Sequence, residues 1–257
     1  MQDTTLQTDM PPPRLRWWDM ALPLLGGAIV FALITFGVAM LAITKGDAGV
    51  IERFAERMQS AEQGYALNMG VMAALYLPPL IVMFWIARRK GLEYFSPVAL
   101  RVICWALAGG VLYAVAFQAA QDFLINHGIV SYTPSPGELL LVPHNVVQLL
   151  LGLGLAAIFG PFVEEFYFRG MLLSWSRRRM PLVWAGILNA VLFGVVHLYF
   201  LQHAGLEGIF VTAVMALFGG LNVWWVVRTG SLWPAFASHA AYNGVGLFLM
   251  FLFPGGV

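Results

Sequence analysis

Long apolar stretches alternate with short polar segments along most of this chain. Stretches with almost no charged side chains recur from residue 20 to residue 253, and a helix needs about twenty apolar residues to cross a bilayer. The pattern predicts an all-α polytopic membrane protein with about seven transmembrane helices. The predicted spans are 20–44, 66–87, 102–122, 144–175, 181–200, 208–227 and 231–253.

Three segments of this pattern have features of their own. Pro78 and Pro79 predict a break or kink in the second span, because proline lacks the N–H that a helix needs. The fourth span is longer than one crossing requires, so we expect it to tilt or to project from the bilayer. Segment 48–62 has apolar residues at near-helical spacing and predicts an amphipathic helix in the first outer loop. Such a helix can lie on the membrane surface or pack on the protein itself.

The chain is expected to form one domain behind a short tail. Residues 1–17 are mostly polar and contain three consecutive prolines, which predicts a flexible N-terminal tail. The apolar stretch that follows is too long for a cleavable signal peptide and suits a spanning helix. Residues 18–257 are therefore interpreted as a single transmembrane helical domain.

The basic residues indicate the orientation. Seven spans place four basic segments on one side of the membrane, whereas loop 123–143 on the other side has no lysine or arginine. The positive-inside rule then predicts a cytoplasmic N-terminus and a C-terminus outside, and we expect a bacterial inner membrane protein. The basic residues of these four segments are Arg14, Arg16, Arg88, Arg89, Lys90, Arg101, Arg177, Arg178, Arg179 and Arg228.

Composition excludes several classes of function. The chain has 257 residues, of which 60% are hydrophobic and 11% charged, a balance unlike that of a soluble domain. Its net charge of +1 gives no basic surface for nucleic acid, so the expected partners are the lipid bilayer and a substrate. Cys104 is the only cysteine, which excludes an intrachain disulfide and a CxxC metal site. Glycine pairs permit close helix packing, but they leave the oligomeric state open.

Few ionisable side chains lie within the predicted spans. A charge at bilayer depth costs at least about 2.5 kcal/mol on insertion scales, so each is a candidate functional residue. Asp122 is the weakest candidate because it lies at a span boundary, and we expect Asn189 and Asn222 to bridge helices. The ionisable residues are Asp122, Glu164, Glu165, Arg169, His197 and His239.

The fourth span carries the stretch GPFVEEFYFRG, with two carboxylates and a guanidinium. Glu165 and Arg169 are four residues apart and share a helix face, so they can neutralise each other. Glu164 is rotated by about 100° from Glu165 and is five residues from Arg169. This spacing leaves one unpaired carboxylate, which suits general acid–base chemistry. The alternative is a three-group salt cluster that only holds helices together.

Two later spans carry histidines with a partner four residues away. Phe193 precedes His197 on one helix face, and His239 precedes Asn243 on another. Counting about 1.5 Å per residue from the cytosolic boundaries puts Glu164 and both histidines within about one and a half helical turns in depth. One pocket could therefore hold all three groups.

The chemistry of such a pocket has two versions. A carboxylate and a histidine can polarise water while a second histidine and an amide stabilise an oxyanion, as in a hydrolase. Alternatively, Glu164, His197 and His239 could hold Zn²⁺, which lowers the pKa of a bound water. The chain lacks the HExxH spacing that would favour zinc, and no serine or cysteine is evidently paired for covalent catalysis. The cofactor is therefore none or zinc.

Three motifs in this order on late spans resemble those of the CPBP family. This family comprises the CAAX-protease and bacteriocin-processing intramembrane proteases, also called Abi, and its eukaryotic members trim the last three residues from prenylated CAAX proteins. The resemblance covers roughly residues 140–250, where we expect the catalytic core. The motifs are Glu164-Glu165-x-x-x-Arg169, Phe193-x-x-x-His197 and His239-x-x-x-Asn243.

The resemblance implies an intramembrane endopeptidase that cuts a membrane-anchored protein or peptide near its anchor. By this resemblance Glu164 and His197 would activate the attacking water, and His239 and Asn243 would line the oxyanion site. The supporting residues would be Glu165, Arg169 and Phe193, with Arg169 orienting the glutamates. The family is often labelled metalloprotease, and a metal-free glutamate mechanism has also been proposed for it.

Two other classes of function remain open from the sequence. One is a non-catalytic immunity factor or scaffold of the same family. The other is a proton-coupled transporter, which is disfavoured because the chain has no evident internal repeat. The physiological substrate and the involvement of prenylation also stay open.

Overall fold

The computed structural model describes residues 15–47, 49–60, 63–130, 141–201 and 205–253. In this part of the chain no strand is present, and six helices are long and apolar enough to cross a membrane. The expected span 181–200 corresponds to α9 (Leu182–Leu201), whose fully described apolar part, Leu182–Leu198, is shorter. The prediction of an all-α, multi-pass integral membrane protein is confirmed. The other spanning helices are α1 (Trp17–Lys45), α3 (Gln63–Lys90), α4 (Leu100–Asn126), the composite helix Val146–Ser176, α10 (Gly205–Thr229) and α11 (Trp233–Leu252).

The composite helix differs from a regular α-helix in two places. Two stretches adopt π-helical i→i+5 hydrogen bonding on either side of the glutamate pair, which the sequence pattern did not predict. Such wider turns are rare and often occur at functional sites. Because they fit more residues into a given length, they also help the long span to match the bilayer. The segments are α6 (Val146–Gly152), η2 (Leu153–Phe159), α7 (Gly160–Glu165), η3 (Phe166–Leu172) and α8 (Leu173–Ser176).

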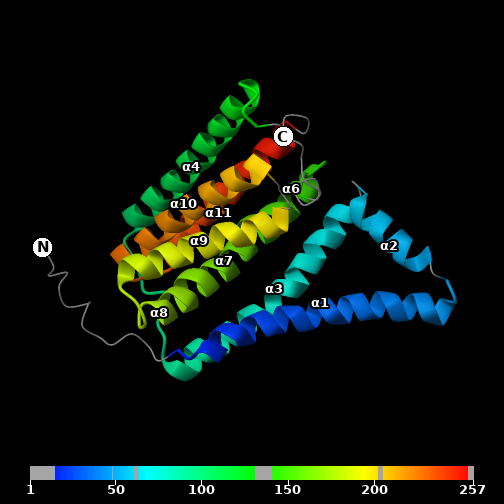
Figure 1. Cartoon of the computed structure of the whole chain (residues 1–257), viewed down its shortest axis with the longest axis horizontal. Helices are drawn as coiled ribbons and strands as arrows, with labels where there is room; N and C mark the ends of the chain where they lie inside the picture. Colours follow the sequence, from blue (N-terminus) through cyan, green and yellow to red (C-terminus); the bar gives the residue numbers. More distant parts are fainter. Residues whose placement is uncertain (1–14, 48, 61–62, 131–140, 202–204, 254–257) are drawn as a thin grey trace, which may run out of the picture.

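The helices form two groups (Figure 1). The composite helix, α4, α9, α10 and α11 lie together as a bundle, in which α9 packs on α10 and α11 packs on α4. The second group contains α1, α3 and the short helix α2 (Gly49–Gln59), and it meets the bundle mainly through α3. This arrangement puts α3 alongside the segment that carries the glutamate pair.

Glycines allow the bundle helices to approach closely. A Cβ atom at Gly110 would lie 2.1 Å from the Ser238 carbonyl oxygen, and one at Gly194 would lie 2.4 Å from the Thr212 carbonyl oxygen. Only glycine permits α4 and α9 to touch the backbones of α11 and α10 in this way. Close packing at Gly110 is therefore internal to the chain.

The N-terminal group of helices contains the predicted amphipathic helix, but its two adjacent prolines do not interrupt their helix. Helix α2 is amphipathic and packs against both α1 and α3. Helix α3 runs through Pro78 and Pro79 without interruption, so the predicted break is not found, whereas the predicted kink stays a prediction. Helix α1 begins at Trp17, within the predicted tail, and residues 1–14 lie outside the described residues.

Contacts between helix ends and between loops bring basic segments to one end of the protein. Asp19 at the start of α1 pairs with Lys90 at the end of α3, with a distance of 3.0 Å. The turn between α10 and α11 meets the loop 91–99, where the Ser231 hydroxyl donates to the Ser96 carbonyl oxygen at 2.7 Å. This gathering agrees with the basic alternation in the sequence.

Candidate active site

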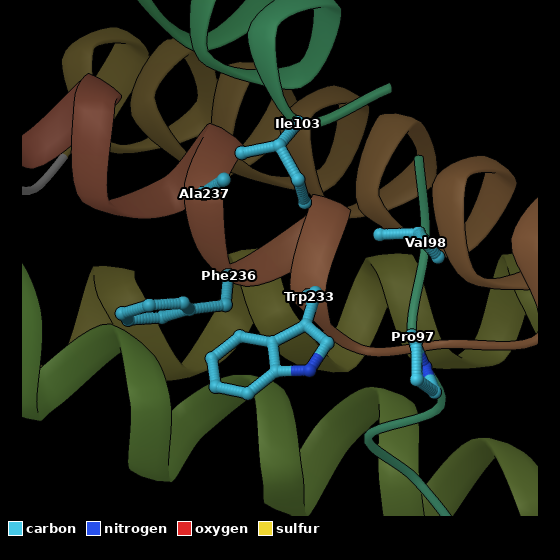
Figure 2. A pocket seen from close by; sticks show the side chains of 6 residues that line it. All are labelled: Pro97, Val98, Ile103, Trp233, Phe236 and Ala237. Atoms are coloured by element: carbon cyan, nitrogen blue, oxygen red, sulfur yellow. The ribbon is translucent and has the colours of Figure 1, made fainter. Parts of the chain in front are cut away.

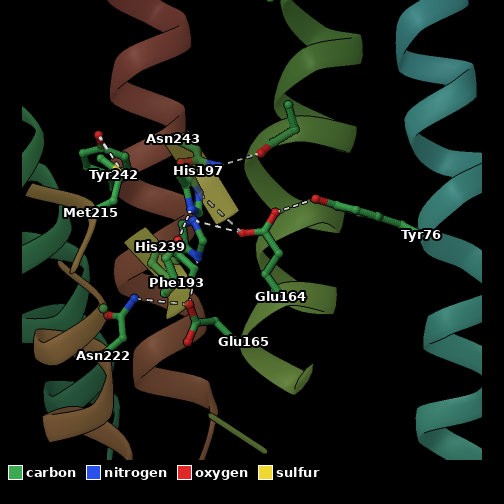
Figure 3. A network of polar contacts seen from close by, with 12 residues as sticks. Tyr76, Glu164, Glu165, Phe193, His197, Met215, Asn222, His239, Tyr242 and Asn243 are labelled. Carbon is green, nitrogen blue, oxygen red and sulfur yellow. Dashed lines mark hydrogen bonds and ion pairs between the residues drawn. The ribbon is translucent and has the colours of Figure 1, made fainter. Parts of the chain in front are cut away.

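Three helices bring the predicted polar residues together (Figure 3). Glu164 on α7 places Oε2 at 3.9 Å from Nε2 of His197 on α9 and at 3.9 Å from Nε2 of His239 on α11. One ligand-type atom from each of the three residues lies within 4.8 Å of the others. These distances agree with the common depth expected from the sequence.

A backbone contact orients His197. Its Nδ1 lies 2.8 Å from the carbonyl oxygen of Phe193, one turn earlier on the same helix. A carbonyl oxygen only accepts hydrogen bonds, so Nδ1 carries a proton, and in the neutral ring the lone pair of Nε2 faces Glu164. The buried Phe193 ring also lies against both imidazoles, with centroids 4.3 Å from His197 and 5.5 Å from His239.

Glu165 organises the buried side of the site. Its Oε1 lies 2.8 Å from Nδ1 of His239 and accepts from Nδ2 of Asn222 at 3.2 Å. The same oxygen pairs with Nη1 of Arg169 at 3.1 Å, and Nη2 of Arg169 donates to the Gly219 carbonyl oxygen at 3.1 Å. Glu165 and Arg169 are each only 1% exposed, and a buried charge requires such partners. The predicted support pair is therefore formed.

Glu164 has different partners from Glu165. Its Oε1 accepts a hydrogen bond from the hydroxyl of Tyr76 on α3, with a distance of 2.7 Å. Its buried Oε2 receives no hydrogen bond from the described residues. Arg169 forms its ion pair with Glu165 within the described part of the chain, and no such pair reaches Glu164. The three-group salt cluster considered from the sequence is therefore not what these contacts form.

Asn243 compensates for a gap in the π-helical hydrogen bonds. In the i→i+5 register of η2, the carbonyl oxygen of Ala156 would accept from residue 161, which is proline and has no N–H. Nδ2 of Asn243 donates to that carbonyl oxygen instead, at 2.9 Å. An amide nitrogen carries two hydrogens, so one donor of Asn243 remains for another acceptor.

The converging atoms define what the site can bind. Nδ1 of His239 faces a carboxylate and Nδ1 of His197 faces a carbonyl, so each ring, when neutral, presents a bare Nε2 atom to Oε2 of Glu164. Three hydrogen-bond acceptors facing one another suit a bound water or a cation. Two imidazoles and one carboxylate are also a common zinc donor set, in which other groups hold the second ring nitrogens. The residues therefore fit both versions of the chemistry.

An apolar groove lies beside this site at the start of α11 (Figure 2). Its volume is about 320 Å³. Phe236 lies one turn before His239, and its ring packs edge-to-face on Phe162 with centroids 5.6 Å apart. The groove thus adjoins the segment that carries Glu164. Its lining residues are Pro97, Val98, Ile103, Trp233, Phe236 and Ala237.

The sequence indicated some of these contacts and missed others. Asn189 bridges helices as expected, since its Nδ2 donates to the Phe168 carbonyl oxygen at 2.6 Å. Asn222 also bridges helices, but it does so through Glu165 of the site itself. Tyr76 was not predicted, because a single tyrosine in an apolar span has no spacing relation to Glu164. The contact between the Tyr76 phenol and the Glu164 carboxylate can be recognised only from the packing of α3 against α7.

One family model matches the chain. Residues 146–245 match the model described as "Type II CAAX prenyl endopeptidase Rce1-like". No curated protein and no solved structure is found to match. The match covers the site-bearing segment from α6 to α11, and it confirms the resemblance to the CPBP family.

Proposed function

We propose that this protein is an intramembrane endopeptidase that hydrolyses a peptide bond near a membrane anchor, because its segment 146–245 is similar to a protease family. The observation that carries the proposal is the meeting of Oε2 of Glu164 with the two Nε2 atoms, each at 3.9 Å. A carboxylate with one free oxygen beside two oriented imidazoles is a set of groups suited to acid–base hydrolysis.

Glu164 is the base of the proposed reaction. A water between Oε2 of Glu164 and Nε2 of His197 gives one proton to the carboxylate while its oxygen attacks the peptide carbonyl carbon. The proton then passes from Glu164 to the amide nitrogen as the C–N bond breaks. The products are a new carboxyl terminus and a free amine. His197 orients the water by accepting its second hydrogen at Nε2, the atom left bare by the contact with Phe193.

His239 and Asn243 stabilise the negative oxygen of the tetrahedral intermediate in this proposal. Asn243 has one N–H beyond the bond that it gives to Ala156. His239 donates from Nε2 when its ring carries both protons, and the carboxylate of Glu165 at Nδ1 stabilises that form. Glu165 and Arg169 support the site through His239 rather than touching the substrate.

A zinc-dependent form of the same hydrolysis uses the same residues differently. Glu164, His197 and His239 would hold Zn²⁺, since their donor atoms already lie within 4.8 Å. When bound there, the ion would supply Lewis-acid activation of water. We favour the metal-free form, because Glu164 is the carboxylate of this cluster with a free oxygen and would be consumed as a ligand, whereas Glu165 is already occupied.

The proposed orientation follows from the basic residues. We infer a cytoplasmic N-terminus and an outside C-terminus, because basic segments gather at one end of the helices. We further propose that the membrane is the inner membrane of a bacterium. The apolar groove opens near this end, at the start of α11. A substrate whose anchor is apolar could place that anchor in the groove while its peptide bond reaches Glu164.

A cleavage assay tests the proposal. The full chain is reconstituted in liposomes and given a farnesylated peptide ending in a CAAX tetrapeptide, with a fluorophore and quencher across the expected bond. Comparison of membrane peptides from cells with wild-type protein and with Glu164→Gln searches for substrates of other kinds. Cleavage that requires Glu164 and His197 but not the exposed Glu52 on α2 supports the proposal. Full biological function in Glu164→Gln and His197→Ala cells would instead favour a non-catalytic immunity or scaffold protein.

A further inference from the structure

The hydroxyl of Tyr76 donates to Oε1 of Glu164 at 2.7 Å, from a helix outside the segment that matches the protease family. We propose that Tyr76 is a positioning residue that holds one oxygen of Glu164 so that the other oxygen faces the two histidines (Figure 3). This inference rests on the proposed function, because it gives Tyr76 its effect through the base of that reaction.

The first argument is the freedom of a glutamate carboxylate. The last side-chain torsion of glutamate has a broad energy profile, so an unrestrained carboxylate samples many orientations. Among the described residues, the Tyr76 hydroxyl is the hydrogen-bond donor to Oε1 of Glu164, and Oε2 receives no such bond. A hydrogen bond to an ionised acceptor is stronger than a neutral one. Fixing Oε1 therefore directs Oε2 towards Nε2 of His197 and Nε2 of His239.

The second argument is that Tyr76 is itself held in place. Its ring packs on Phe159, with centroids 6.4 Å apart, and a Cβ at Gly160 would lie 3.4 Å from Cε2 of Tyr76. Pro78 lies two residues after Tyr76 in α3 and packs against α1. A Cβ atom added at Gly26 of α1 would lie 3.3 Å from the Cβ atom of Pro78. Contacts on both sides thus fix the helix that carries the phenol.

The chain offers a matched control in Tyr113. Its hydroxyl donates to the Val214 carbonyl oxygen at 2.6 Å and joins α4 to α10, so it is also a half-buried phenol that links two helices. It ends on a backbone carbonyl and not on Glu164. Removing either hydroxyl leaves an acceptor without its donor, but only the loss at Tyr76 frees the proposed base.

The experiment compares Tyr76→Phe with Tyr113→Phe in the full chain in liposomes. On the farnesylated CAAX peptide we expect Tyr76→Phe to lower kcat by about 10- to 100-fold, an effect comparable to losing a group that orients a metal ligand, with little change in KM. Tyr113→Phe should keep kcat within about two-fold of wild type, since it touches no reacting group. Thermal unfolding of both variants shows whether their stability losses match.

An activity-independent measurement accompanies the kinetics. Infrared spectra of protein labelled with ¹³C-glutamate, with the Glu164→Gln spectrum subtracted, isolate the carboxyl band of Glu164. Loss of the phenol hydrogen bond should shift this band in Tyr76→Phe and leave it in place in Tyr113→Phe. Thus the contact itself is tested even if the peptide is a poor substrate.

Two results would overturn the inference while leaving the proposed function intact. One is an unshifted Glu164 band in Tyr76→Phe, and the other is an unchanged kcat in a variant of normal stability. Wild-type cleavage that persists in Glu164→Gln would instead overturn the proposed function, and with it the catalytic effect assigned to Tyr76.

Discussion

Nδ1 of His239 lies 2.8 Å from Oε1 of Glu165, and this contact joins α11 to α7 inside the protein. The same oxygen of Glu165 also receives Arg169 and Asn222. Glu165 therefore fixes the ring of His239 and neutralises a buried guanidinium at once. Glu164, the preceding residue, contacts neither Arg169 nor Nδ1 of His239 in this way. The two adjacent glutamates should therefore respond differently to substitution.

Glu165→Gln should destabilise the protein strongly. It leaves the Arg169 guanidinium buried without its counter-charge, and breaking a buried ion pair costs about 3–5 kcal/mol. Thermal unfolding in detergent measures the loss. The double variant Glu165→Gln with Arg169→Met removes both charges and should regain part of the stability without regaining activity. A double variant no more stable than Glu165→Gln would contradict the pairing.

Glu164→Gln should abolish cleavage and keep stability near that of wild type. Among the described residues the carboxylate pairs with histidines at 3.9 Å and with no arginine or lysine, whereas loss of a general base costs about 10²- to 10⁴-fold in rate. The measurements are kcat on the farnesylated peptide and the unfolding temperature, with Glu52→Gln as the control. A stability loss as large as that of Glu165→Gln would show that Glu164 is a structural clamp.

Asn243→Ala should lower both stability and activity, and a second change should separate the two effects. The variant leaves the Ala156 carbonyl oxygen unpaired, at a cost of about 1–3 kcal/mol. Adding Pro161→Ala supplies the N–H that this carbonyl lacks in the i→i+5 register. The double variant should therefore recover stability while kcat stays low, because the donor for the oxyanion is still missing. Recovery of kcat together with stability would assign Asn243 a structural role only.

Phe236→Ala should weaken binding of a lipidated substrate more than it slows the reaction. The ring lines the apolar groove next to the site, and loss of apolar contact acts on substrate binding. We expect a higher KM for the farnesylated peptide with kcat changed by less than about three-fold. The same peptide without its farnesyl group should show no difference between variant and wild type. Equal effects on both peptides would exclude the groove as an anchor site.

Cleavage should survive removal of metal. Oε2 of Glu164 is the free carboxylate oxygen of the cluster, and we assign it to proton transfer rather than to metal binding. Activity is measured before and after dialysis against a zinc chelator, and bound zinc is measured by mass spectrometry of the native protein. Loss of activity with the chelator, restored by zinc, would establish the zinc-dependent form.

The sequence located the spans and singled out the charged residues that the structure brings together, for a physical reason. Bilayer crossing demands long apolar runs, and an unneeded charge within them is costly, so Glu164 and its neighbours were conspicuous. Helix periodicity was also sufficient to pair Glu165 with Arg169.

The contacts that could not be predicted from the sequence depend on backbone register or on tertiary packing. An i→i+5 turn leaves no mark in side-chain composition, so η2, η3 and the bond from Asn243 to Ala156 were missed. Tyr76 lies 88 residues before Glu164, and nothing local connects them. The sequence alone therefore indicates the charged residues of the site but not the neutral residues that contact them.

The two π-helical segments set the rotational phase of the glutamates. Each accommodates an extra residue relative to an α-helix, and one residue corresponds to about 100° of rotation. Deleting a single residue within η2 would restore α-helical bonding and turn Leu149 and the rest of α6 relative to Glu164 by that angle. The rotational positions of Leu149, which packs on Leu247, and of the glutamates in the middle of the composite helix are therefore set separately. Changes in chain length here should matter more than changes in side chain.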